Sequence, residues 1–210
     1  MNLANIEHQL LKSNEWLNSC SKLIGGLTFK GYLKNVISVS LADLSIEHNR
    51  SINLLVQSHN FGSAFALIRL QLEACVRSNW VFNCAKEVEI KSFYDGGEPP
   101  KIQLMIDAIE TVDAYTEKQL SGIKFKVWRN LNGFTHGGDF HVRSRISSTE
   151  IVSNYDNKLI MELIHFSTKI SLFSATTISW VADNSDIGSK LLESYKLICS
   201  DQIAQGEKSE

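Results

Sequence analysis

Hydrophobic residues recur at three- and four-residue spacing along most of the chain, and strict alternation of apolar and polar residues is scarce. This spacing places apolar side chains on one face of a helix, so it predicts a mostly helical protein. We expect about seven helices, over Leu3–Ser21, Tyr32–Gln57, Asn60–Trp80, Ile102–Val112, Glu117–Asn132, a segment from Asn154 or Asp156 to Trp180, and Ser185–Cys199.

The helix expected over Asn60–Trp80 is apolar nearly all round, which places it at the centre of the fold. Residues Val142–Ser153 are rich in Ser, Thr and β-branched residues, and this composition favours an extended segment. The polar tail Ser200–Glu210 lacks an apolar face and is expected to be frayed or disordered. Because the sequence shows no evident linker or internal repeat, residues 1–210 are predicted to form one all-α domain, a helical bundle.

Composition narrows the class of protein. The chain has 210 residues, of which 43% are hydrophobic, enough for a core that needs no disulfide or metal. Its four cysteines form no C-x-x-C pair and fit free, mostly buried thiols in a reducing compartment. The N-terminal sequence lacks the pattern of a secretory signal. The apolar stretch Leu159–Ala182 is interrupted by ionisable residues, so no membrane span is predicted. Together with the cysteines and the N-terminal sequence, this predicts a protein located in the cytoplasm.

Charge is unevenly distributed along the chain. The formal net charge is -2, but the segment Gly122–Ile146 sums to +4, which leaves -6 for the other residues. This segment contains a helix end followed by a glycine-rich loop, with Arg129, Asn130 and His136 close together in sequence. The cations Lys124, Lys126, Arg143 and Arg145 flank them and are candidates for binding a nucleic-acid backbone.

Arg129, followed directly by Asn130 and, after six intervening residues, by His136, resembles the signature of the HEPN superfamily of all-helical domains. A second stretch, Ala64–Ala74, is similar to a helix with Arg and Glu in uncharacterised bacterial HEPN-like families. The resemblance implies a homodimeric bundle with the signature at a helix end. It also implies a metal-independent ribonuclease of the kind found among toxins and defence systems, although many relatives are inactive or uncharacterised.

The chemistry of these side chains is compatible with RNA cleavage. A histidine such as His136 can move a proton at the 2′-hydroxyl or at the leaving 5′-oxygen. The planar guanidinium of Arg129 can bind a phosphoryl group through two hydrogen bonds, and Asn130 can orient either group. The leading prediction is therefore a metal-independent endoribonuclease or toxin-like RNA-binding protein without a cofactor. Its expected partners are RNA, a second copy of the chain, and an antitoxin or another protein.

Other interpretations of the same residues stay open. Arg129 and His136 can be ordinary polar groups at a helix end, in which case the protein is a non-catalytic HEPN-like scaffold that binds a partner or ligand. His136, Asp139 and His141 are spaced as possible metal ligands, but no fourth ligand is evident nearby, so no metal site is predicted.

Arg69, Glu73 and Arg77 follow one another at four-residue spacing on the central helix. A ladder of ion pairs on one helix face is the simplest interpretation, because an unpaired charge on so apolar a helix is costly. Alternatively, Arg69 and Glu73 support the loop that carries His136.

Overall fold

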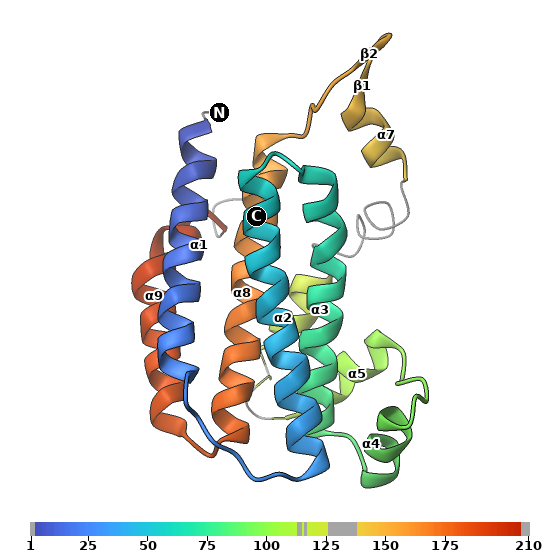
Figure 1. Ribbon diagram of the computed structural model, residues 1–210, viewed down its shortest axis with the longest axis vertical. Coiled ribbons are helices and arrows are strands. Elements are labelled where there is room, and N and C mark those ends of the chain that lie inside the picture. Colours follow the sequence, from blue (N-terminus) through green and yellow to red (C-terminus); the bar gives the residue numbers. More distant parts are fainter. Residues whose placement is uncertain (1–2, 113–114, 116, 126–137, 207–210) are drawn as a thin grey trace.

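The computed structural model describes residues 3–112, 115, 117–125 and 138–206. Four long helices run side by side through the molecule, and a fifth packs along one side (Figure 1). They are α1 (Leu3–Ile24), α2 (Leu33–Gln57), α3 (Phe61–Asn83), α8 (Asn157–Val181) and α9 (Ser185–Gly206), with α9 against α1 and α8. The predicted all-α helical bundle is confirmed.

The ends of the long helices follow from local sequence signals. Helix α1 ends at Gly25–Gly26, where Gly26 has a φ of 80°, a conformation that glycine adopts without strain. Residues 58–60 join α2 to α3 so tightly that the two helices must be antiparallel neighbours. Asp156 caps α8, as predicted, by accepting a 2.7 Å hydrogen bond from the backbone nitrogen of Lys158.

Short elements fill the chain between α3 and α8. They are α4 (Glu87–Tyr94), α5 (Ile102–Ile109), a helical stretch over 119–125, α7 (Asp139–Arg145), and a small antiparallel hairpin of β1 (Ile146–Ser147) and β2 (Glu150–Ile151). Helix α5 follows the two prolines, as predicted. Helix α4 was not predicted. Its eight residues are too few for a clear hydrophobic repeat, and one of its side chains, Ile90, is buried.

The prediction of an extended segment over Val142–Ser153 is wrong for its first part, which is the end of α7. This helix has Asp139 in its first turn and Arg143 and Arg145 in its last turn, an arrangement that complements the helix dipole. The hairpin occupies the remainder, so the β-branched composition was informative only there. The predicted end of the last helix at Cys199 is also too early, because no proline or glycine interrupts the sequence before Gly206.

The interior of the bundle contains hydrogen-bonded polar side chains as well as apolar ones. Gln71 on α3 donates from Nε2 to the carbonyl oxygen of Ser167 on α8 at 2.8 Å, and the Ser167 hydroxyl donates to Gln71 Oε1 at 2.7 Å. Asn49 on α2 donates to the same hydroxyl at 2.7 Å. All three side chains are fully buried. Hydrogen bonds thus join α2, α3 and α8 inside the core, where an unpaired polar group would be costly.

Besides this polar layer, apolar side chains form two clusters in the core. Ile68 and Leu72 of α3 pack with Ile106 of α5 and Ile164 of α8 in the main cluster. A second cluster lies where α1, α2, α8 and α9 meet, around Trp16. The indole nitrogen of Trp16 donates to Ser171 Oγ at 2.8 Å, so this large side chain is buried with its polar atom satisfied.

The cysteines are free thiols, as predicted, and three of them are buried. Burial raises the pKa of both Cys20 and Cys75 to about 12, so their reactive thiolate form is rare at neutral pH. These thiols are parts of the core. Across the described residues, no helix is long and apolar enough to cross a membrane.

Candidate functional site

Helix α7 and the β1–β2 hairpin form an arm that projects from one end of the bundle, beside the start of α3 (Figure 1). Backbone hydrogen bonds tie the segment after β2 to the end of α7. Val152 N donates to the carbonyl oxygen of Arg145 at 2.9 Å, and Asn154 N donates to that of Ser144 at 2.8 Å. These bonds fix the backbone at the C-terminal end of α7, where Arg145 lies.

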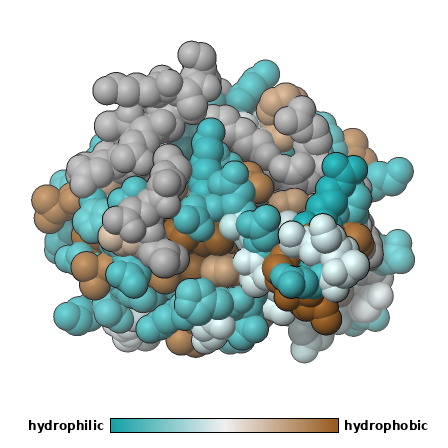
Figure 2. Space-filling model, turned by 90° about the horizontal axis from the view of Figure 1, so that it is seen from above, coloured by the Kyte–Doolittle hydropathy of each residue, from teal (hydrophilic) through white to brown (hydrophobic). Residues whose placement is uncertain are grey.

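Aromatic rings attach the arm to the bundle. Phe140 on α7 contacts Phe65 on α3 edge-on, with ring centroids 5.2 Å apart, and Tyr155 stacks on Phe65 at 5.9 Å. Phe140 also contacts Tyr155 at 5.6 Å. Seen from above, this end of the molecule is a mixed surface in which hydrophobic side chains show between hydrophilic ones (Figure 2). The arm therefore has a fixed apolar base.

Three polar side chains converge on Gly62, in the first turn of α3. A Cβ atom added to Gly62 would lie 2.9 Å from Arg145 Nη2, 2.9 Å from Tyr155 Oη and 3.5 Å from His141 Nδ1. His141 Nδ1 and Tyr155 Oη are hydrogen-bonded at 3.0 Å. We call these four residues the Gly62 cluster. A larger residue at position 62 would force the Arg145 guanidinium or the Tyr155 hydroxyl to shift.

The two arginines of α7 have different surroundings. Arg143 is 81% exposed and lies 3.6 Å from the carboxylate of Asp139, one turn earlier on the same helix. Arg145 is also exposed, but no carboxylate of the described residues lies within 4.0 Å of it. The Arg145 guanidinium instead lies over Gly62, as do Tyr155 Oη and His141 Nδ1. That cluster is therefore cationic, and a guanidinium in such surroundings suits an oxyanion.

The predicted catalytic residues Arg129, Asn130 and His136 lie outside the described residues, as does Lys126. Lys124 lies in the last turn of the helical stretch over 119–125 and donates a hydrogen bond to Gln103 on α5. Arg143 and Arg145 lie on α7, at the end of the bundle from which the arm projects. The described cations of the predicted basic segment therefore belong to two separate elements.

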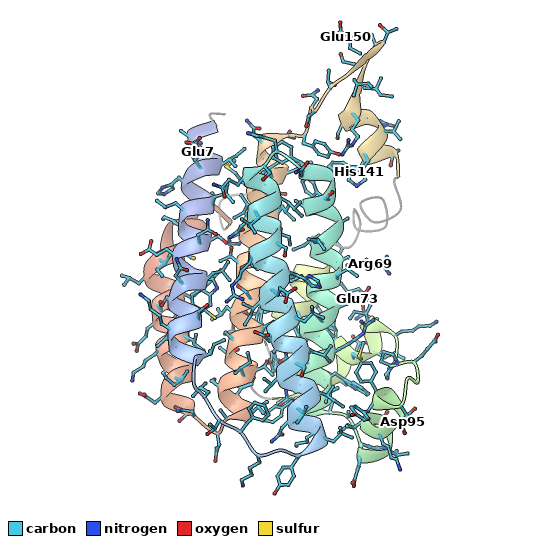
Figure 3. All side chains as sticks on the ribbon, viewed as in Figure 1. Glu7, Arg69, Glu73, Asp95, His141 and Glu150 are labelled. Atoms are coloured by element: carbon cyan, nitrogen blue, oxygen red, sulfur yellow. The ribbon has the colours of Figure 1, made fainter. Side chains whose placement is uncertain are left out.

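The ion-pair ladder predicted on α3 is confirmed. Arg69 Nε lies 2.8 Å from Glu73 Oε1, and Arg77 Nη2 lies 2.9 Å from Glu73 Oε2. Glu73 is 15% exposed, so it is largely shielded from water and is neutralised by an arginine on either side. Figure 3 shows Arg69 and Glu73 part-way along α3 and His141 beside its first turn. Arg69 and Glu73 are also predicted to support the loop that carries His136, but that residue lies outside the described ranges.

Other places in the described residues hold no comparable cluster. No three His, Cys, Asp or Glu side chains gather there as metal ligands would. Of the predicted metal-ligand alternatives, Asp139 lies beside Arg143, and His141 is bonded to Tyr155. A shallow groove of about 370 Å³ lies between α1 and the α2–α3 connection, lined mainly by apolar residues such as Leu10 and Phe61. Its polar lining comes from Glu7, Asn14, Gln57 and His59.

Sequence reasoning had selected Arg145 for its charge but missed its neighbours in the cluster. His141 stood out only as a possible metal ligand, and Tyr155 and Gly62 did not stand out. One available signal was the glycine in the first turn of a long apolar helix, where alanine would be the better helix former. Such a glycine indicates that another group approaches closely, but it does not identify that group.

A family model matches residues 42–200, which is most of the chain. The chain belongs to this family, DUF6988, a family of unknown function. The match runs from within α2 into α9, so the DUF6988 region includes the Gly62 cluster, the ion-pair ladder and the segment with Arg129 and His136. No curated protein and no solved structure matches the chain.

Proposed function

We propose that this member of DUF6988 is an RNA-binding, metal-independent endoribonuclease. In this proposal His136 transfers the proton, Arg129 binds the scissile phosphate and Asn130 orients them, as the HEPN resemblance implies. The observation that carries the proposal is the cationic arm. Exposed Arg143 and Arg145 lie on α7, which projects from the bundle and begins three residues after His136 in the sequence.

The position of the arm supports an RNA backbone as the ligand. Exposed arginines on a projecting helix can reach the phosphates of a strand without moving the bundle. Both are held on a short element whose base is packed against α3, so little ordering is needed when the strand binds. The proposal includes a homodimer, which light scattering of the purified chain would detect as twice the monomer mass.

Cleavage of labelled single-stranded RNA in the presence of a chelator tests the activity. The wild-type chain is expected to cleave, and Arg129→Ala and His136→Ala are each expected to lower the rate by about 100-fold or more, as loss of an acid–base or phosphate-stabilising group does. Thermal unfolding of each variant shows that it is folded. Lys101→Ala is a matched control, because it removes an exposed cation before α5. Absent cleavage, or equal cleavage by all four proteins, would favour the non-catalytic scaffold.

A further inference from the structure

We propose that the Gly62 cluster is a phosphate-binding subsite for an RNA strand, in which Arg145 and His141 hold the phosphate and Tyr155 positions His141. The proposal rests on the proposed function in one respect: the bound phosphate is taken to belong to RNA. It adds a binding site built from residues other than Arg129, Asn130 and His136. It also predicts unequal roles for the two arginines of α7, which charge alone does not distinguish.

The first argument is electrostatic. Each acidic side chain near the cluster in sequence has another position or partner. Asp139 lies beside Arg143, and Asp156 accepts the hydrogen bond that caps α8. Glu150 lies at the far tip of the hairpin (Figure 3). A guanidinium that is paired with its own carboxylate must lose that partner before it binds a phosphate. Arg145 has no such partner to lose within the described residues.

The second argument is positional. The backbone of Arg145 is held by the hydrogen bond from Val152, and the ring of Tyr155 is held between Phe65, Phe140 and Phe61. Tyr155 in turn fixes the orientation of the imidazole of His141 through their 3.0 Å hydrogen bond. The polar groups are therefore placed before a ligand arrives, and this preorganisation favours binding.

The third argument is the glycine. With hydrogen at the Cα of Gly62, the three polar groups can meet over the first turn of α3, whereas a methyl group would lie 2.9 Å from two of them. Within a helix, alanine is intrinsically more favourable than glycine. Gly62→Ala therefore separates two effects: it disturbs the cluster, while the helix itself gains intrinsic stability.

The test is binding of a fluorescent single-stranded RNA whose 2′-hydroxyls are all methylated, so that attack by a 2′-oxygen cannot cleave it. Arg145→Gln is expected to weaken binding about tenfold or more, since a charge-assisted hydrogen bond contributes on that scale. The slope of log affinity against log salt should fall by about one. Arg143→Gln removes the same charge from the same helix and is expected to weaken binding less than about threefold, as for an exposed charge.

Three further variants examine the other members of the cluster. His141→Gln should weaken binding, and Gly62→Ala should weaken it like Arg145→Gln without lowering the melting temperature. Tyr155→Phe keeps the stacked ring, so it should leave the fold intact while it weakens binding and shifts the NMR resonances of the His141 side chain. If Tyr155 were merely structural, the His141 resonances would stay in place.

The outcomes separate this inference from the function on which it rests. If the wild-type chain does not bind the methylated RNA, the proposed RNA function fails and the subsite fails with it. If the wild-type chain binds, but Arg145→Gln and Arg143→Gln weaken binding equally, the subsite alone is overturned. Unequal losses support the subsite whether or not unmodified RNA is cleaved.

Discussion

The interior of the bundle and the Gly62 cluster both contain polar side chains, but their hydrogen bonds are arranged differently. In the interior, Gln71 and Ser167 donate to each other across two helices and are fully buried. In the Gly62 cluster, Arg145 is exposed and has no carboxylate partner among the described residues. Polar groups that satisfy one another hold a fold together, whereas an exposed cation without a protein counterion is available to a ligand.

The largest expected effect comes from breaking the apolar packing around the interior. Leu72 of α3 is fully buried, and Leu72→Ala should lower the free energy of unfolding by about 2–5 kcal/mol, because it removes apolar contacts and leaves a cavity. Leu70 lies on the same helix but is 46% exposed, so Leu70→Ala should cost less, about 1 kcal/mol. Denaturant unfolding measures both. Similar losses would contradict the burial difference.

A smaller effect is expected from the polar layer. Gln71→Leu leaves the Ser167 hydroxyl without its acceptor and the Ser167 carbonyl oxygen without the donor on Gln71, so the free energy of unfolding should fall by about 1–3 kcal/mol although the new side chain is apolar. The exposed Gln57 at the end of α2 provides the control, and Gln57→Leu should change stability by less than about 0.5 kcal/mol. A more stable Gln71→Leu protein would show that the polar layer does not stabilise the bundle.

The smallest effect is expected in the arm. Ile151 is 93% exposed on the hairpin, so Ile151→Thr should change the free energy of unfolding by less than about 0.5 kcal/mol. The same exchange at the fully buried Ile52 places a hydroxyl in the core and should be clearly destabilising. If chemical denaturation shows a loss above about 1 kcal/mol for Ile151→Thr, the hairpin is packed rather than exposed.

The long helices were predictable because each buries one face, and the apolar residues of that face recur in the sequence over many turns. It missed α4 and α7 because neither is longer than eight residues, too short for a clear hydrophobic repeat. The ion-pair ladder was predictable because its members lie one turn apart on one helix. The Gly62 cluster was not, since Gly62 and Tyr155 are brought together only by the packing of α3 with the end of the arm.

The order of helices along the chain has a consequence for how the protein can change. Helices α2 and α3 are adjacent in sequence, while α8 joins them only after residues 84–156, which include the whole arm. The entropy of closing such a loop grows only with the logarithm of its length, so insertions in its exposed hairpin, residues 146–151, cost the bundle little, whereas α5 is part of the core. New surfaces for binding can thus arise at the tip of the arm during evolution, while the helices that keep the chain folded stay as they are.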